Sequence, residues 1–288
     1  MTKNILITGA KGQLGSELEV LYAQYPEFNF IPTDVDTLDL TQKEAVVKIV
    51  QDKKIDYIVN CAAYTAVDKA EDDVELCYKI NRDAVKNLAE AAKGKARIIH
   101  VSTDYVFDGR ATAPYKETDT THPQSVYGKS KREGEEALLA ICPESIIIRT
   151  AWLYSIYGNN FVKTMLRLGK ERPELNVVYD QKGTPTYAAD LAQAILSIIV
   201  YTEKEKTFPS GVYHYSNEGI TTWFDFTEKI FQLAGITGCT VHPIPTDQYP
   251  TKATRPMYSV LDKTKIKETF GIIVPEWELS LKKCINLL

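Results

Sequence analysis

Short apolar runs alternate with helical stripes through the first 150 residues, and this alternation most restricts the fold. Five runs rich in β-branched residues have the length of buried strands, at 4–8, 28–33, 56–61, 97–102 and 145–149. Between them, apolar residues recur at helical spacing, in 14–25, 45–50, 73–92 and 126–140. Apolar strands separated by helices predict a parallel sheet covered on both faces.

The pattern changes after residue 150, where prolines and aromatic residues become denser in 152–157, 208–215 and 242–256. A chain of 288 residues is long enough for about two domains. We therefore predict an α/β fold, with a Rossmann-like doubly wound parallel sheet in residues 1–150. Residues 151–288 mainly form a smaller C-terminal lobe over the carboxyl ends of the strands, and a segment near 180–205 returns to the first domain.

Composition excludes several classes of protein. The 34 basic and 38 acidic residues give a net charge of −4 without long blocks of one sign, which argues against nucleic acid as a partner. The longest apolar stretch, near 194–201, is far shorter than the roughly 20 residues that span a bilayer. The five cysteines form no CxxC motif, and the N-terminus shows no signal-peptide pattern. We expect a cytoplasmic protein without a membrane partner or a Cys/His metal site.

A glycine-rich turn follows the first predicted strand. Gly9, Gly12 and Gly15 have the spacing G-x-x-G-x-x-G and open the first predicted helix. Glycine permits positive φ and close backbone approach, and a helix N-terminus can hold a pyrophosphate. The turn predicts an NAD(P)-binding site in residues 1–150. The alternative is a purely structural strand-to-helix turn.

An acidic residue follows the second predicted strand, where dinucleotide-binding proteins often hold the adenosine ribose. Asp34 lies 19 positions after Gly15, and Asp36 and Asp39 follow it. A carboxylate at this place accepts a hydrogen bond from a free 2′-hydroxyl and repels a 2′-phosphate. The sequence therefore favours NADH over NADPH, unless these aspartates form only a solvated loop.

Tyr127 and Lys131 are four residues apart on a predicted helix and so share one face. A nearby cation favours the phenolate, which lets a tyrosine exchange its proton closer to neutral pH. Alone, the pair could equally be an exposed helical pair. Thr103 changes this interpretation, because its hydroxyl lies at the end of the preceding predicted strand, where it can face the same carbonyl group as Tyr127.

In this order, these features resemble the extended short-chain dehydrogenase/reductases. Matching segments run almost from end to end of the chain: ITGAKGQLG (7–15), NCAAYTAVDKAE (60–71), STDYVFDG (102–109), YKETDTTHPQSVYGKSKREGE (115–135), RTAWLY (149–154), GNNFVKTMLRL (158–168), DQKGTPTYAADLA (180–192) and RPMYSVLD (255–262). The resemblance implies reduction of the 4-keto group of dTDP-4-dehydro-L-rhamnose to dTDP-L-rhamnose by NADPH or NADH. Such a step supplies rhamnose for cell-surface polysaccharide.

The resemblance also implies roles for individual residues. Tyr127 would be the general acid, Lys131 would lower its pKa and hold the nicotinamide ribose, and Thr103 would supply a hydroxyl. The residues implied around the dinucleotide are Gly9, Gly12, Gln13, Leu14, Gly15, Asp34, Asp39, Leu40, Ala62, Ala63, Tyr64, Tyr127 and Lys131. Those implied around the nucleotide sugar are Thr65, Val67, Thr103, Asp104, Tyr105, Trp152 and Arg255.

Several alternatives stay open at this point. Trp152 either stacks on the sugar or packs in the core, and Arg255 binds the diphosphate or forms a surface ion pair. Asn81 matches a helix asparagine that sustains a proton relay in the superfamily, or makes an ordinary helix–loop hydrogen bond. The same residues would serve a reductase or epimerase of another nucleotide sugar, and a non-catalytic dinucleotide-binding subunit is the rival from another class. Some relatives bind magnesium at a dimer contact, but neither magnesium nor a homodimer can be read from this sequence.

Overall fold

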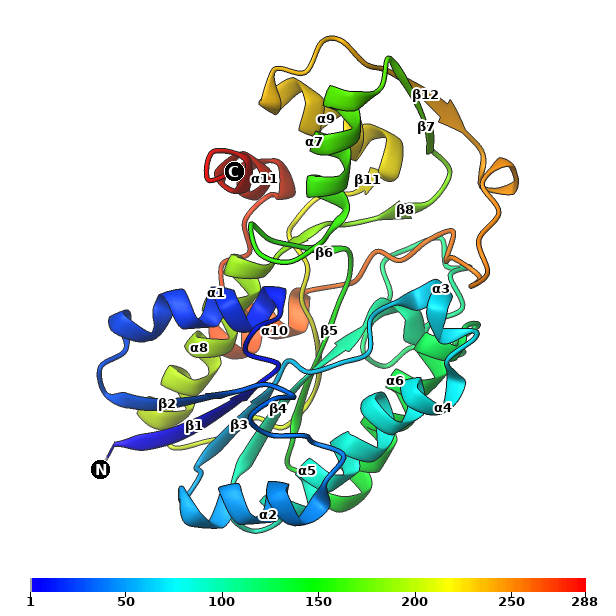
Figure 1. Ribbon diagram of the computed structural model, residues 1–288. Helices are drawn as coiled ribbons and strands as arrows, with labels where there is room; N and C mark the ends of the chain where they lie inside the picture. The colour runs from blue at the N-terminus through cyan, green and yellow to red at the C-terminus, as the bar shows by residue number, and fades with distance from the viewer. Residues whose placement is uncertain (1) are drawn as a thin grey trace.

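A six-stranded parallel sheet forms the lower half of the molecule in the computed structural model, which describes residues 2–288 (Figure 1). Its order is β2-β1-β3-β4-β5-β10. After β1 and β2 the following strands are added on the other side of β1, so the strand order reverses between β1 and β3. The predicted α/β fold class is confirmed. The strands are β1 (Lys3–Thr8), β2 (Phe28–Thr33), β3 (Tyr57–Asn60), β4 (Arg97–Thr103), β5 (Ile146–Thr150) and β10 (Gly211–His214).

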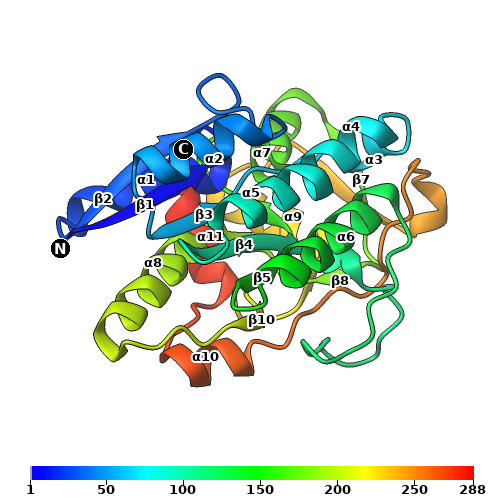
Figure 2. The same cartoon turned by 90° about the horizontal axis from the view of Figure 1, so that it is seen from below.

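Helices cover both faces of this sheet (Figure 2). Along β1, Ile5 and Ile7 join one buried cluster, whereas Leu6 joins the other, as the alternation of a strand requires. The first face is covered by α1 (Gln13–Leu21), α8 (Ala188–Glu205) and α10 (Thr264–Phe270), and the second by α2 (Lys43–Asp52), α5 (Ala84–Ala92) and α6 (Val126–Ile141). Short 3₁₀ turns at Tyr22–Gln24, Asp104–Val106 and Thr246–Gln248 join other elements.

The sheet takes one strand and one covering helix from the chain after residue 210. Strand β10 pairs with β5, and Ile266 and Phe270 of α10 are buried in the cluster that contains α8. In the sequence, 208–215 shows only the denser prolines and aromatic residues and no strand pattern. A four-residue strand between prolines and polar residues carries too short a pattern to be recognised.

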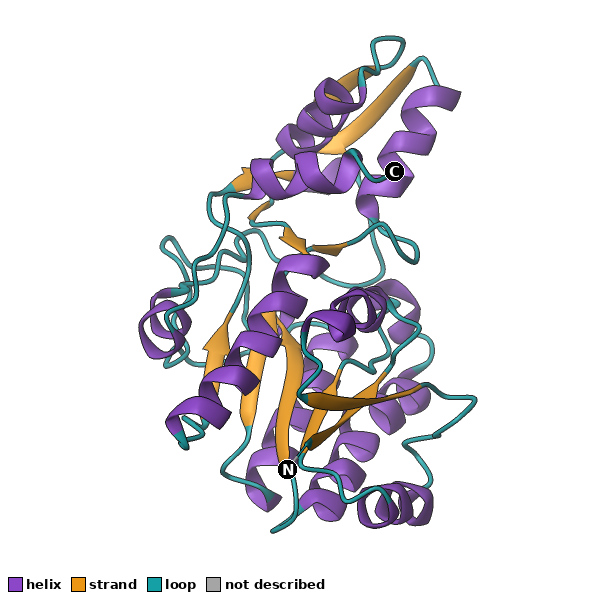
Figure 3. Cartoon of the chain, turned by 90° about the vertical axis from the view of Figure 1, so that its left-hand side faces the viewer, coloured by secondary structure: helices purple, strands orange, loops and turns teal. Residues whose placement is uncertain are grey.

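The upper half is built from three helices and three two-stranded ribbons around its own core (Figure 3). Val162, Phe226, Ile230 and Leu281 are almost fully buried there. The elements are β6 (Leu153–Tyr154) with β9 (Thr186–Tyr187), β7 (Glu174–Val178) with β12 (Thr240–Ile244), β8 (Lys182–Gly183) with β11 (Thr221–Thr222), and the helices α7 (Phe161–Glu171), α9 (Trp223–Ala234) and α11 (Trp277–Ile285).

The helix predicted over 73–92 contains a π-helical turn. It is divided into α4 (Val74–Tyr78), the π turn Lys79–Asp83 and α5, and the short α3 (Val67–Ala70) precedes it. A π turn inserts one extra residue per turn and is frequent at functional sites. Here it directs the Asn81 side chain inward, where the residue is 1% exposed.

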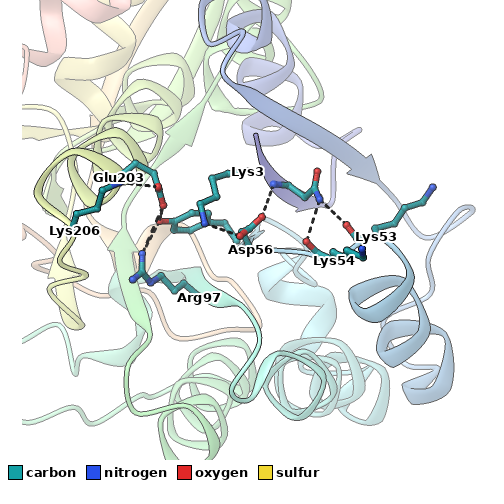
Figure 4. A network of polar contacts seen from close by, with 9 residues as sticks. Lys3, Lys53, Lys54, Asp56, Arg97, Glu203 and Lys206 are labelled. Atoms are coloured by element: carbon teal, nitrogen blue, oxygen red, sulfur yellow. Dashed lines mark hydrogen bonds and ion pairs between the residues drawn. The ribbon is translucent and has the colours of Figure 1, made fainter. Parts of the chain in front are cut away.

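Polar contacts tie the amino ends of the strands to the end of α8 (Figure 4). Lys3 Nζ lies 2.9 Å from Asp56 Oδ1, the Tyr57 hydroxyl donates to Glu203 over 2.6 Å, and Arg97 donates to that hydroxyl over 2.9 Å. These partly exposed pairs contribute little stability each. They lie at the amino ends of the strands, whereas the candidate site lies at the carboxyl ends.

None of the helices in residues 2–288 is long and apolar enough to cross a membrane.

Candidate active site

The glycine turn joins β1 to α1 and leaves no room for side chains. Gly9 has φ +65°, and a Cβ added to it would lie 2.8 Å from the backbone of Ala62 after β3. A Cβ on Gly15 would overlap the Gly9 carbonyl oxygen. Helix α1 has no side-chain cap, so its first N–H groups are left for another partner. This is the geometry that a pyrophosphate requires.

A cavity of about 450 Å³ opens beside this turn, between the ends of β1 and β3. In open α/β sheets this reversal of strand order is the usual ligand site. Seven of the residues implied around the dinucleotide line the cavity: Gly9, Gly12, Asp34, Asp39, Leu40, Ala62 and Ala63. The residues present therefore fit a nicotinamide dinucleotide.

Other residues implied around the dinucleotide have different surroundings. The Leu14 side chain is buried in the core, so only its backbone faces the turn. Gln13 Oε1 accepts from Asn160 over 3.0 Å, and the Tyr64 hydroxyl donates to Asp73 over 3.0 Å. Gln13 and Tyr64 do not line the cavity, and their hydrogen bonds instead orient the walls of the site.

Asp34 is held by backbone groups at the cavity. Its carboxylate accepts from the N–H of Lys11 over 2.9 Å and from that of Val35 over 2.8 Å. The exposed Lys11 ammonium pairs with Asp36, and hydrogen bonding to Thr41 lowers the pKa of Asp39. The cavity mouth thus carries a cation as well as carboxylates. From the sequence alone, only the carboxylates pointed to the choice of coenzyme.

Helix α6 brings Tyr127 and Lys131 to the carboxyl end of β4. Ser125 caps this helix by accepting from the Gly128 N–H over 3.1 Å, and Gly128 packs against the Tyr105 carbonyl, where a Cβ would clash. Tyr127 is 9% exposed and Lys131 is 2% exposed. The pair is therefore not an exposed helical pair.

The Thr103 hydroxyl lies beside Tyr127 at the end of β4. It donates to Asp104 Oδ1 over 2.9 Å and accepts from the Tyr105 N–H over 3.2 Å. Burial raises the pKa of Tyr127 above its ordinary value of 10.0, and a hydrogen bond with Thr103 acts in the opposite direction. Burial also raises the pKa of Asp104 to about 6. The Tyr105 ring contacts the Tyr127 ring edge to face, with centroids 5.5 Å apart.

Lys131 is directed toward β4. Its Nζ donates to the Val101 carbonyl over 2.7 Å and lies 3.4 Å from His100 Nε2, and burial lowers the pKa of the lysine to about 8. The role that the resemblance implies for Lys131, lowering the pKa of Tyr127, stays a prediction; in the described residues, burial raises the pKa of that phenol.

Asn81 fastens the loop after β3 to α6. Its Oδ1 accepts from the Tyr64 N–H over 2.8 Å, and its Nδ2 donates to the Tyr64 carbonyl and to Ser130 Oγ. This is the helix–loop hydrogen bonding that the sequence analysis weighed for Asn81. It fixes the segment that contains Ala62 and Ala63 next to the helix that carries Tyr127.

The residues implied around the sugar fall into two groups, one around Tyr127 and one in the lobe. In the first group, Val67 and Tyr105 pack around Tyr127 and Cys77, together with Tyr64 from the dinucleotide set. Thr65 is exposed in the loop before α3.

Arg255 reaches the first of these groups, where it donates to the Tyr105 hydroxyl over 2.9 Å and pairs with Asp68. Asp68 was missed by the sequence analysis, since a carboxylate in a short helix gives no signal of its own.

Trp152 belongs to the lobe and has φ +48°. Its indole stacks on Trp223 with ring centroids 3.5 Å apart and planes 9° from parallel, and Gly183 approaches the same indole. The packing alternative of the sequence analysis therefore describes at least one face of this ring.

Within residues 2–288, no three His, Cys, Asp or Glu side chains lie close enough together to hold a metal ion.

A Rossmann-type sheet, a glycine turn at the reversal of strand order and a buried Tyr–Lys helix define the short-chain dehydrogenase/reductase class. Residues 2–288 match the model of a family described as the RmlD substrate binding domain. The chain therefore belongs to this family, that of the dTDP-4-dehydrorhamnose reductases.

Named relatives agree with this assignment. A dTDP-4-dehydrorhamnose reductase from Aggregatibacter actinomycetemcomitans is 46% identical over 284 residues, covering 96% of this chain and 97% of that protein. The crystal structure of one from Clostridium acetobutylicum is 48% identical with TM-score 0.92 and covers 99% of both chains. One from Bacillus anthracis in complex with NADP is 39% identical with TM-score 0.94 and covers all of both chains.

Proposed function

We propose that this protein is a dTDP-4-dehydrorhamnose reductase that uses NADPH to form dTDP-L-rhamnose. The observation that carries the proposal is the buried Tyr127, which lies beside the Thr103 hydroxyl at the carboxyl end of β4. The cavity at the reversal of strand order supplies a place for the dinucleotide nearby in the same sheet. The names of the relatives support the substrate.

The cofactor, when bound, supplies hydride to the 4-keto carbon. The chain has to bind it, orient the sugar and deliver one proton to the carbonyl oxygen. Gly9, Gly12 and Gly15 provide close backbone approach at the start of α1, and Asp34, Asp39 and Leu40 line the cavity beyond them. These residues hold the dinucleotide in our proposal.

Tyr127 donates the proton at its phenol oxygen. Because burial raises its pKa, the hydroxyl is fully protonated at neutral pH and available as an acid. The Thr103 hydroxyl donates a second hydrogen bond to the same carbonyl oxygen, after exchanging its present acceptor on Asp104. Lys131, with a pKa near 8, restores the proton to the phenolate and contacts the nicotinamide ribose.

The loop and lobe residues bind the nucleotide sugar. Tyr105 and Val67 form one wall with Tyr127, and Arg255 offers a guanidinium that can exchange Asp68 for the diphosphate. We assign Trp152, which stacks on Trp223 in the lobe, to the sugar side of the proposed pocket. Thr65 and Asp104 complete the proposed pocket.

The test is oxidation of NADPH, and separately of NADH, with enzymatically prepared dTDP-4-dehydrorhamnose. Tyr127→Phe should lower kcat by about 10²–10⁴-fold, the usual contribution of a general acid. Tyr179→Phe, at an exposed tyrosine, is the matched control and should keep the parent rate. Full activity in Tyr127→Phe would refute the assigned acid, and tight dinucleotide binding without turnover would favour another sugar or a binding subunit.

The choice of coenzyme follows from the same assay. The exposed Lys11 ammonium, which pairs with Asp36, offers a partner for a 2′-phosphate, and the Bacillus anthracis relative is in complex with NADP. We therefore propose NADPH as the preferred donor, which reverses the preference drawn from Asp34 alone. A cytoplasmic location stays a prediction, and a homodimer stays open.

A further inference from the structure

Three polar residues form a row across the middle of the sheet. Thr8 on β1 is directly opposite Asn60 on β3, which is opposite His100 on β4. Each is at most 1% exposed and directly follows a buried apolar residue of its strand. Buried polar side chains are costly unless they are hydrogen-bonded, so the bonding within this row needs an explanation.

The Asn60 amide has one possible orientation. Its Oδ1 accepts from the Ala62 N–H over 3.2 Å and from the Thr8 hydroxyl over 2.6 Å. A backbone N–H can only donate, so the atom that faces Ala62 must be oxygen. Asn60 Nδ2 therefore faces His100 Nδ1, at 2.9 Å, and donates to it.

This orientation fixes the tautomer of His100. Burial, with the Lys131 charge as a second cause, holds the pKa of His100 well below its ordinary value, so the ring is neutral. A neutral imidazole has one N–H, and Nδ1 is already an acceptor. The proton must be on Nε2, which lies 3.4 Å from Lys131 Nζ.

We propose that His100 is a positioning residue for Lys131, with its Nε2–H pointing at Nζ. In this tautomer, Nε2 cannot accept a hydrogen bond from the ammonium form of Lys131, but it donates one to the amine form. Two donors face each other when Lys131 is charged, whereas the lone pair of the neutral amine accepts from His100. The row therefore makes Lys131 a better proton donor near neutral pH. The inference rests on the proposed reductase, in which Lys131 returns the proton to Tyr127.

The other titratable groups around Lys131 act in the opposite direction. Glu135 on α6, Cys61 just after β3 and Cys77 on α4 all favour its charged form, and burial opposes them. On the β4 side, His100 therefore acts in the same direction as burial and favours the neutral amine of Lys131. The same Asn60 also holds the Ala62 N–H at the cavity, so one side chain orders both the cofactor wall and the histidine.

The tautomer can be measured in the unmodified protein without dinucleotide or substrate. Two-bond ¹H–¹⁵N correlation spectra of histidine-labelled protein distinguish Nε2–H from Nδ1–H, and a His100 substitution assigns the resonance. We expect neutral His100 with its proton on Nε2 across the neutral pH range. A proton on Nδ1 would overturn the proposal.

The effect on Lys131 is measured by titrating its side-chain NMR signal, assigned with Lys131→Met. His100→Asn keeps an acceptor for Asn60 but is too short to place a donor at the position of Nε2, and it opens space, whereas His100→Met removes the donor and fills the space. We expect both to raise the midpoint of Lys131 by about one pH unit, the worth of one net hydrogen bond. His214→Asn changes another buried histidine, which bonds the Tyr115 carbonyl, and should leave the midpoint unchanged.

The outcomes separate the proposal from its alternatives. A rise in His100→Asn alone would show that water entry moves the midpoint, and no rise in either variant would show that His100 does not act on Lys131; both results overturn the inference. These titrations need no turnover, so a failure of the reductase assay would refute the proposed function without deciding this one.

Discussion

Replacing Lys131 by methionine should stabilise the fold while removing activity. Burial lowers the pKa of Lys131 from 10.5 to about 8. Each pKa unit corresponds to 1.36 kcal/mol, so keeping this ammonium ion in the folded state costs about 3 kcal/mol. Methionine has a similar length and no charge, but it loses the hydrogen bond to Val101, worth about 1 kcal/mol. The net gain at pH 7 is about 2 kcal/mol.

The sign of this effect depends on pH in a defined way. Because the folded-state pKa lies below the unfolded-state pKa, the unfolded chain binds the proton more tightly. The cost to the wild type is complete below pH 8 and disappears as the pH rises through about 10.5. The advantage of Lys131→Met should therefore shrink over that interval.

The assay is equilibrium unfolding in urea at pH 7 and at pH 9.5, followed by circular dichroism. Lys129→Met, at an exposed position of the same helix, is the control and should change stability by less than about 0.5 kcal/mol. A Lys131→Met protein that is less stable than the wild type at pH 7 would refute the reasoning. A gain that is equal at both pH values would also refute it, because titration of Lys131 would then not be its source.

Three further results are expected. Gly15→Ala forces a Cβ onto the Gly9 carbonyl oxygen, so it should abolish dinucleotide binding in calorimetry and destabilise the fold by about 1–3 kcal/mol. Gly238→Ala is the control and should do neither, because a Cβ at Gly238 points into open space. Glu135→Gln breaks the buried two-bond pair with Arg149 and should cost about 3–5 kcal/mol in urea unfolding; a cost below that of an exposed pair would contradict the assigned burial. Burial lowers the pKa of His214 to about 3, so the unfolded state binds its proton first; stability should fall by up to about 1.4 kcal/mol per pH unit between pH 6.5 and 3, and His214→Asn should flatten this slope.

Much of the fold could be predicted because local patterns and tertiary structure agree in the first 150 residues. The strand predicted at 28–33 coincides with β2, and the helix predicted at 126–140 is α6 within one residue. Strands buried on both faces must be continuously apolar, and such runs are visible without an alignment. Beyond residue 150 the strands are two to five residues long, too short for a period to be detected.

The site was predicted unevenly for a related reason. Gly9 and Tyr127 could be found because a turn or a helix fixes their spacing locally. Asp68 and His100 could not, since their partners are 187 and 31 residues away in the chain. A polar residue between two apolar neighbours of its strand was the one signal for His100, and it becomes informative only when Asn60 is known to lie beside it.

The sequence by itself determined the alternation of strands and helices, the glycine turn and the shared face of Tyr127 and Lys131, because each depends on residues within a few positions of one another. Only the tertiary structure decided which strands are neighbours, and with that the row from Thr8 through Asn60 to His100. It also decided the protonation of Lys131, since the loss of water around an ammonium ion depends on everything packed against it. Proton affinity is a property of the surroundings, and the surroundings come from the whole fold.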